Sequence, residues 1–132
     1  MTINERPLSP HLQIYKLELP MVCSGLHRIT GIALSVGSIL LVAWLASAVY
    51  SAEAFADFSR FFGSIIGQLM LFGWTFSLIY HSVNGIRYLL WDTGRNLEIK
   101  QIHSSGTIGL AVAIILSVLA WILGGGFPGG AL

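Results

Sequence analysis

The sequence predicts an all-α membrane protein in which three transmembrane helices form a bundle behind an extended N-terminal arm. Of its 132 residues, 55% are hydrophobic and only 10% are charged, and the mean hydropathy is +0.76. A soluble domain carries about 25% charged residues. The length leaves room for about three spans of ~20 residues and short loops, so we expect one transmembrane domain over residues 1–132. A soluble catalytic domain is excluded.

Residues 1–20 are predicted to form the arm, because Pro7, Pro10 and Pro20 interrupt any helix there. Pro20 also suits the first turn of a following helix, where its missing N–H would be unpaired in any case. The arm has no apolar core with a small-residue cleavage site, and it is not rich in Arg and Ser. We therefore expect neither a signal nor a transit peptide, which favours a bacterial chain over a mitochondrial one.

The three spans are expected at about residues 21–50, 61–91 and 104–123. The first is free of charge from Ile29 to Ala52, and the second is free of charge up to Ile86. Polar segments 51–60 and 93–103 are predicted to be loops between the spans, and the first loop has room for a short amphipathic turn. A glycine-rich run after residue 123 cannot continue a stable helix, so the third span ends there.

The positive residues predict the orientation in the membrane. Of the seven Lys and Arg, only Arg60 lies in the first loop, and the others lie on the side of the N-terminus and the second loop. The N-terminus is therefore expected in the cytoplasm and the C-terminus outside. The polar start of the first span and the polar end of the second then lie at similar depth. The net charge of +1 says nothing about nucleic acid, but the chain has no basic tract, so no nucleic-acid partner is expected.

His81 is the main candidate for chemistry, because an ionisable residue inside an apolar span is expensive. Gly85, Tyr88 and Asp92 share its helical face. A neutral imidazole at that depth needs a metal, a haem iron or a hydrogen-bond acceptor as partner. Gly85 removes the side chain that would block a flat macrocycle and favours haem. A histidine hydrogen-bonded to a hydroxyl or carbonyl within the bundle is the alternative.

A second polar face in the first span contains Ser24, His27, Arg28 and Gly31. A hydroxyl close to a guanidinium suits a quinone carbonyl or a haem propionate. An arginine that reaches up to lipid phosphate is the alternative for Arg28. Arg87 has three candidate partners: a propionate, a lipid headgroup or Asp92. The chain has no Cys-x-x-Cys-His motif, so any haem is bound non-covalently as type b.

Three segments resemble signatures of the cytochrome b subunits of succinate dehydrogenase. They are Arg6-Pro-Leu8, the run Ser24-Gly-Leu-His-Arg-Ile-Thr30 and the run from His81 through Gly-Ile-Arg-Tyr to Gly94. The likeness covers most of the chain. One departure is Tyr88, where the family often has histidine; a phenol at this position could donate one hydrogen bond to a propionate but carries no positive charge.

The resemblance implies a membrane-anchor subunit of succinate:quinone oxidoreductase, respiratory complex II, in the bacterial inner membrane. Expected partners are a second hydrophobic anchor subunit, an iron–sulfur subunit and a flavoprotein subunit, besides lipid. The chain itself would contain no catalytic residue for succinate oxidation.

The resemblance also implies site residues. His81 would be one axial ligand of haem b, with the other ligand supplied by the second anchor subunit. His27 and Arg87 would lie near the propionates, and Gly85 would give the macrocycle clearance. Ser24 and Arg28 would bind ubiquinone.

Three rival interpretations remain open. In a self-contained cytochrome b, His27 and His81 would both ligate one haem. A dihaem quinol:fumarate reductase anchor would need four ligating histidines, and His11 and His103 are poorly placed for that role. A small transporter or purely structural anchor would need no haem.

Overall fold

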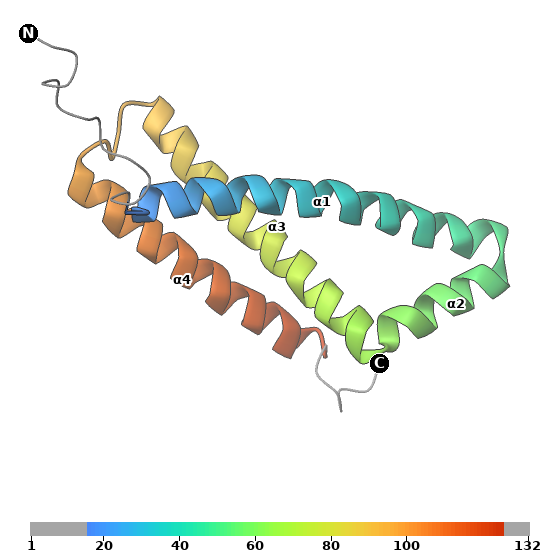
Figure 1. The fold of residues 1–132 in the computed structure, drawn as a ribbon. Helices are drawn as coiled ribbons and strands as arrows, with labels where there is room; N and C mark the ends of the chain where they lie inside the picture. Colours follow the sequence, from blue (N-terminus) through green and yellow to red (C-terminus); the bar gives the residue numbers. More distant parts are fainter. Residues whose placement is uncertain (1–15, 126–132) are drawn as a thin grey trace, which may run out of the picture.

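The computed structural model describes residues 16–125, which fold into four α-helices without a strand (Figure 1). These are α1 (Leu19–Tyr50), α2 (Ala52–Gly63), α3 (Ile65–Asp92) and α4 (Ile99–Leu123). The all-α class is therefore confirmed. Residues 1–15, which hold most of the predicted N-terminal arm, lie outside the described residues, and α1 begins at Leu19 with Pro20 in its first turn.

Part of the predicted first loop is a helix, α2, which lies between α1 and α3. Ser51 caps its N-terminus, because the Ser51 hydroxyl accepts a hydrogen bond from the Ala54 amide at 3.2 Å. Ser64 ends α2 and caps α3, where its hydroxyl accepts from the Gly67 amide at 3.2 Å. The chain bends by 80° between these two helices. The helix within the predicted second span therefore begins at Ile65 and not at residue 61.

Helices α1 and α4 are each long and apolar enough to cross a membrane. Helices α2 and α3 meet the same criterion only together, as a bent pair. The described residues thus hold two candidate spans, or three if the bent pair counts as one. Helix α4 begins at Ile99, ahead of the predicted start at residue 104, and ends at Leu123, where Gly124 and then Gly125 (φ 66°) follow.

Helix α3 packs against both α1 and α4, while α2 connects the C-terminal end of α1 to the N-terminal end of α3 (Figure 1). Four of the five buried residues of α3 lie in one stripe at helical spacing: Ser77, Tyr80, Asn84 and Arg87. Small residues allow the helices to approach. A Cβ at Gly106 of α4 would lie 3.3 Å from Arg87 Nη2 and 3.4 Å from Cys23 Sγ of α1.

Candidate functional site

His81 of α3 lies against the first turns of α1, where its ring stacks on that of His27. The ring centroids are 3.8 Å apart and the planes differ by 10°. His81 Nδ1 lies 3.1 Å from the His27 carbonyl oxygen and 3.3 Å from the Thr30 hydroxyl. A carbonyl only accepts, so we assign the His81 proton to Nδ1. The lone pair of Nε2 is then free for a metal, as in histidines that ligate metals in proteins.

The predicted face of α3 turns toward His27. A Cβ at Gly85 would lie 4.0 Å from His27 Cε1, and the Tyr88 ring meets the His27 ring edge-on with centroids 5.0 Å apart. Across the interface, a Cβ at Gly31 would lie only 3.2 Å from His81 Cε1. His27 Nδ1 is buried and has no hydrogen-bond partner in residues 16–125. The two glycines therefore make room for two imidazoles, one of which has an unused polar atom.

Ser24 and Arg28 lie one turn apart on α1, beside this histidine pair. The Ser24 side chain is half-buried and that of Arg28 is exposed. No hydrogen bond or ion pair joins Arg28 to another of the described residues. Its guanidinium is therefore available to a ligand, a lipid or another subunit.

Arg87 turns away from His81 and into the contact between α3 and α4. Its side chain is buried, and it donates hydrogen bonds to three neutral acceptors: the Ser105 hydroxyl at 2.8 Å, the Ile102 carbonyl at 2.8 Å and Asn84 Oδ1 at 3.0 Å. Its guanidinium also stacks on Trp91, 4.4 Å from the ring centroid. Of its five N–H groups, two make no hydrogen bond to the described residues.

Sequence reasoning missed two members of the buried stripe. The Tyr80 hydroxyl donates a 3.0 Å hydrogen bond to the Cys23 carbonyl, and Asn84 Nδ2 lies 3.5 Å from the same oxygen. The spacing of Tyr80, Asn84 and Arg87 at i, i+4 and i+7 was a visible signal for a buried polar face. This stripe adjoins the one that contains His81 on the same helix.

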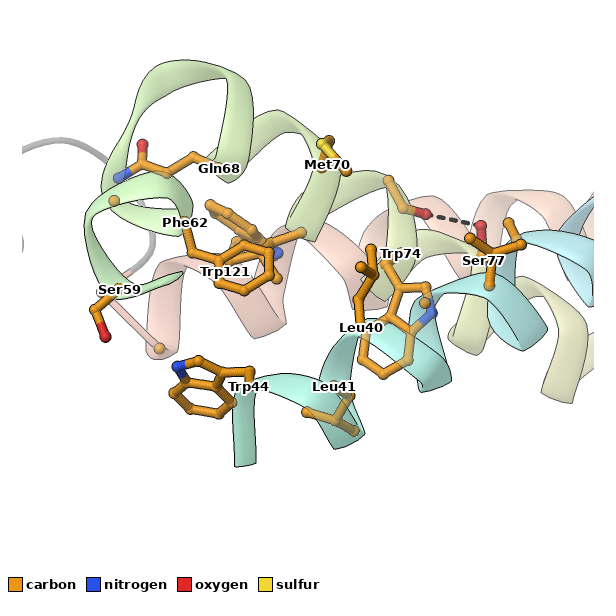
Figure 2. A pocket seen from close by; sticks show the side chains of 18 residues that line it. Leu40, Leu41, Trp44, Ser59, Phe62, Gln68, Met70, Trp74, Ser77 and Trp121 are labelled. Carbon is orange, nitrogen blue, oxygen red and sulfur yellow. Dashed lines mark hydrogen bonds between the residues drawn. The ribbon is translucent and has the colours of Figure 1, made fainter. Parts of the chain in front are cut away.

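A cavity of about 1190 Å³ lies between α1, α2 and α3, beside the end of α4 (Figure 2). Its lining includes Trp44, Trp74 and Trp121. The hydroxyl of Ser77, which also lines it, donates a hydrogen bond to the Gly73 carbonyl at 2.8 Å. The wall contains no Asp, Glu, Lys, Arg, His or Cys. The cavity therefore has no ionisable acid or base. Met70 contributes a thioether, which is a soft metal ligand, but no charged or imidazole side chain lines the wall beside it, so the candidate chemistry lies with the histidine pair.

Comparison with known proteins identifies the family. Residues 2–120 match the family described as succinate dehydrogenase/fumarate reductase transmembrane subunit. The chain belongs to this family. It is 43% identical over 120 residues to the succinate dehydrogenase cytochrome b556 subunit of Paracoccus denitrificans, which covers 91% of this chain and 92% of that relative.

Relatives from a second bacterium and from mitochondria carry similar names. The cytochrome b556 subunit of Rickettsia felis is 36% identical over 119 residues, covering 90% of this chain and 93% of its own. The mitochondrial cytochrome b560 subunit of Bos taurus is 43% identical over 119 residues, covering 89% of this chain and 70% of its own. The predicted resemblance to succinate dehydrogenase cytochrome b subunits is thus confirmed.

Proposed function

We propose that this chain is a membrane-anchor subunit of succinate:quinone oxidoreductase that holds haem b with a second anchor subunit and helps to form the ubiquinone site. The family match supports the assignment to the complex. The hydrogen bond from His81 Nδ1 to the His27 carbonyl carries the proposal for haem, because it orients an imidazole inside an apolar helix and leaves Nε2 unprotonated.

The residues around His81 fit a haem. Gly85 has no side chain that would fill the space beside His27. His27 Nδ1 is a buried polar atom without a partner among the described residues, and it could bond to a propionate. A propionate contact from Arg87 would use its two remaining N–H groups. When bound, haem b accepts and returns single electrons at a potential set by its axial ligands and burial.

The second axial ligand is proposed to come from the partner anchor subunit. His27 and His81 are stacked face to face with ring centroids 3.8 Å apart, so their nitrogens would not both be directed at one iron held between them. This geometry disfavours the self-contained cytochrome. Among residues 16–125, no group of three or more His, Cys, Asp or Glu side chains is placed to hold a metal ion.

Ser24 and Arg28 are proposed to bind the quinone headgroup. The Ser24 hydroxyl would donate a hydrogen bond to one quinone carbonyl. The exposed Arg28 guanidinium would stabilise the negative charge that develops on the quinone oxygens during reduction, which is electrostatic assistance from a preplaced charge. The chain oxidises no succinate in this scheme. Electrons would arrive from the flavoprotein and iron–sulfur subunits.

The proposed setting is the bacterial inner membrane, with α1, the α2–α3 pair and α4 as three spans. The N-terminus would then be cytoplasmic, and Arg28 would face the side on which the iron–sulfur subunit docks.

The haem proposal is tested with His81→Ala in the purified assembled complex. We expect the haem b Soret absorbance per complex to fall strongly or to change shape, while His103→Ala leaves it unaltered. His103 is a suitable control because it lies at the start of α4, where its Nε2 is 3.6 Å from a carboxylate oxygen of Glu18. An unchanged haem spectrum in His81→Ala complexes would rule out His81 as a ligand.

The quinone proposal is tested with Arg28→Ala. We expect succinate-driven ubiquinone reduction to fall about tenfold or more, because one preplaced charge is lost. Succinate oxidation by an artificial dye acceptor should persist. Arg60→Ala is the control, since Arg60 is an exposed arginine whose ion pair with Asp57 is local to α2. Equal loss of both activities would indicate a role in assembly and contradict the proposal.

A further inference from the structure

Two carbonyl oxygens of α1, one turn apart, accept hydrogen bonds from adjacent residues of α3. The Cys23 carbonyl accepts from the Tyr80 hydroxyl at 3.0 Å, and the His27 carbonyl accepts from His81 Nδ1 at 3.1 Å. A carbonyl has two lone pairs, so each can also keep its bond within the helix. Two such points fix both the depth of α1 against α3 and its rotation about its own axis.

The hydrogen bond from Tyr80 to the Cys23 carbonyl belongs to a polar network that joins α1, α3 and α4. Tyr80 is 2% exposed, and Asn84 Nδ2 lies 3.5 Å from the same Cys23 oxygen. Asn84 Oδ1 accepts from Arg87 Nη1 at 3.0 Å, and Arg87 in turn reaches Ser105 and Ile102 of α4. Inside a membrane no water replaces a lost partner, so these bonds hold their geometry.

Rotation of α1 matters because Ser24 follows Cys23 directly and Arg28 lies one turn further along. A polar atom about 5 Å from the helix axis moves by about 1.7 Å when the helix rotates by about 20°. Misplacement of about 1 Å can cost a reaction up to a hundredfold. Loss of the hydrogen bond at Cys23, one of the two points that fix this rotation, would therefore shift Ser24 and Arg28.

We infer that Tyr80 is a positioning residue for quinone reduction, whose hydroxyl holds the Cys23 carbonyl and so sets the rotation of α1 that presents Ser24 and Arg28 to the quinone. This inference rests on the proposed quinone site. Tyr80 acts through the main chain of α1 and touches no substrate. Its effect is therefore distinct from that of a residue that only supports folding.

Tyr80→Phe removes the hydroxyl and keeps the ring. In the purified complex we expect the KM for a short-chain ubiquinone to rise about three- to tenfold, in line with a shift of about 1 Å. Succinate–dye activity and haem absorbance per complex should stay unchanged. Tyr50→Phe is the control, since Tyr50 is 86% exposed at the far end of α1. An unchanged KM overturns the inference, and so does a parallel fall of dye activity, haem content and quinone reduction.

A double-mutant cycle separates positioning from a general effect. If Tyr80 acts through Ser24, Tyr80→Phe should raise the KM less in a Ser24→Ala background than in the parent complex. The same fold-change in both backgrounds overturns the inference. Failure of the proposed quinone site gives a different result, because Ser24→Ala and Arg28→Ala alone would then leave quinone reduction intact.

Discussion

At the scale of single residues, the orientation of His81 depends on a main-chain oxygen and on a missing side chain. The His27 carbonyl holds Nδ1, and Gly31 leaves the space in which the imidazole lies. A metal ligand that is fixed in this way keeps one tautomer and one ring direction. A side chain added at Gly31 should therefore alter the proposed haem site, although Gly31 carries no functional group.

Gly31→Ala should disturb the proposed haem site. Its Cβ would lie 3.2 Å from His81 Cε1, so the ring must move by a few tenths of an ångström. We expect an altered haem b absorption or electron paramagnetic resonance spectrum in the assembled complex, and a larger change in Gly31→Val. Gly25→Ala, whose Cβ has no neighbour within 4 Å, should leave the spectrum as it is. Identical spectra in the Gly31 and Gly25 variants would contradict this view of the site.

The sequence alone indicated His81, Gly85 and the polar face of α1. Burying a polar side chain in a membrane costs free energy, so a polar residue inside an apolar run is rare and easily recognised. It did not indicate that the carbonyls of Cys23 and His27 are acceptors. Every residue has a carbonyl, so no residue type marks the ones that a neighbouring helix uses. The inward turn of Arg87 was hidden for a related reason, since its partners on α4 depend on how α3 and α4 cross.

At the scale of elements, the bend between α2 and α3 is the feature that hydropathy described least well. Segment 51–60 is polar, and this predicted a loop. Two serine caps instead make it a separate amphipathic helix that turns by 80° into α3. Capping signals are short and local, so they decide where helices break inside a segment whose average composition suggests only that it lies outside the membrane core.

Gly67→Ala should destabilise this bend. A Cβ there would collide with the Phe61 carbonyl and lie 2.6 Å from the Phe62 Cα, both of which are backbone atoms of α2. Overpacking costs about 1–3 kcal/mol, which exceeds the ~1 kcal/mol that alanine gains over glycine in a helix. We expect a lower thermal midpoint for the purified complex. Gly73→Ala, with open space around its Cβ, should show no such loss, and equal midpoints for the two variants would count against the tight bend.

At the scale of the whole molecule, the number of membrane crossings decides whether the two polar faces share one side. Helices α1 and α4 qualify as spans on their own, whereas α3 qualifies only with α2. If α3 crosses, the segment between α3 and α4 returns to the side on which α1 begins. If α3 does not cross, that segment faces outward, and the contact between His81 and His27 near the start of α1 could not form in the membrane.

Two glutamate-to-cysteine variants distinguish these arrangements. Glu53→Cys lies in the first turn of α2, and Glu98→Cys lies just before α4. In intact cells a membrane-impermeant thiol reagent should label Glu53→Cys and leave Glu98→Cys unlabelled, and inverted vesicles should give the reverse pattern. The parent chain sets the baseline, because its one cysteine, Cys23, is buried. Labelling of both variants from outside intact cells would show that α3 does not cross, and it would remove the shared cytoplasmic side on which the quinone proposal depends.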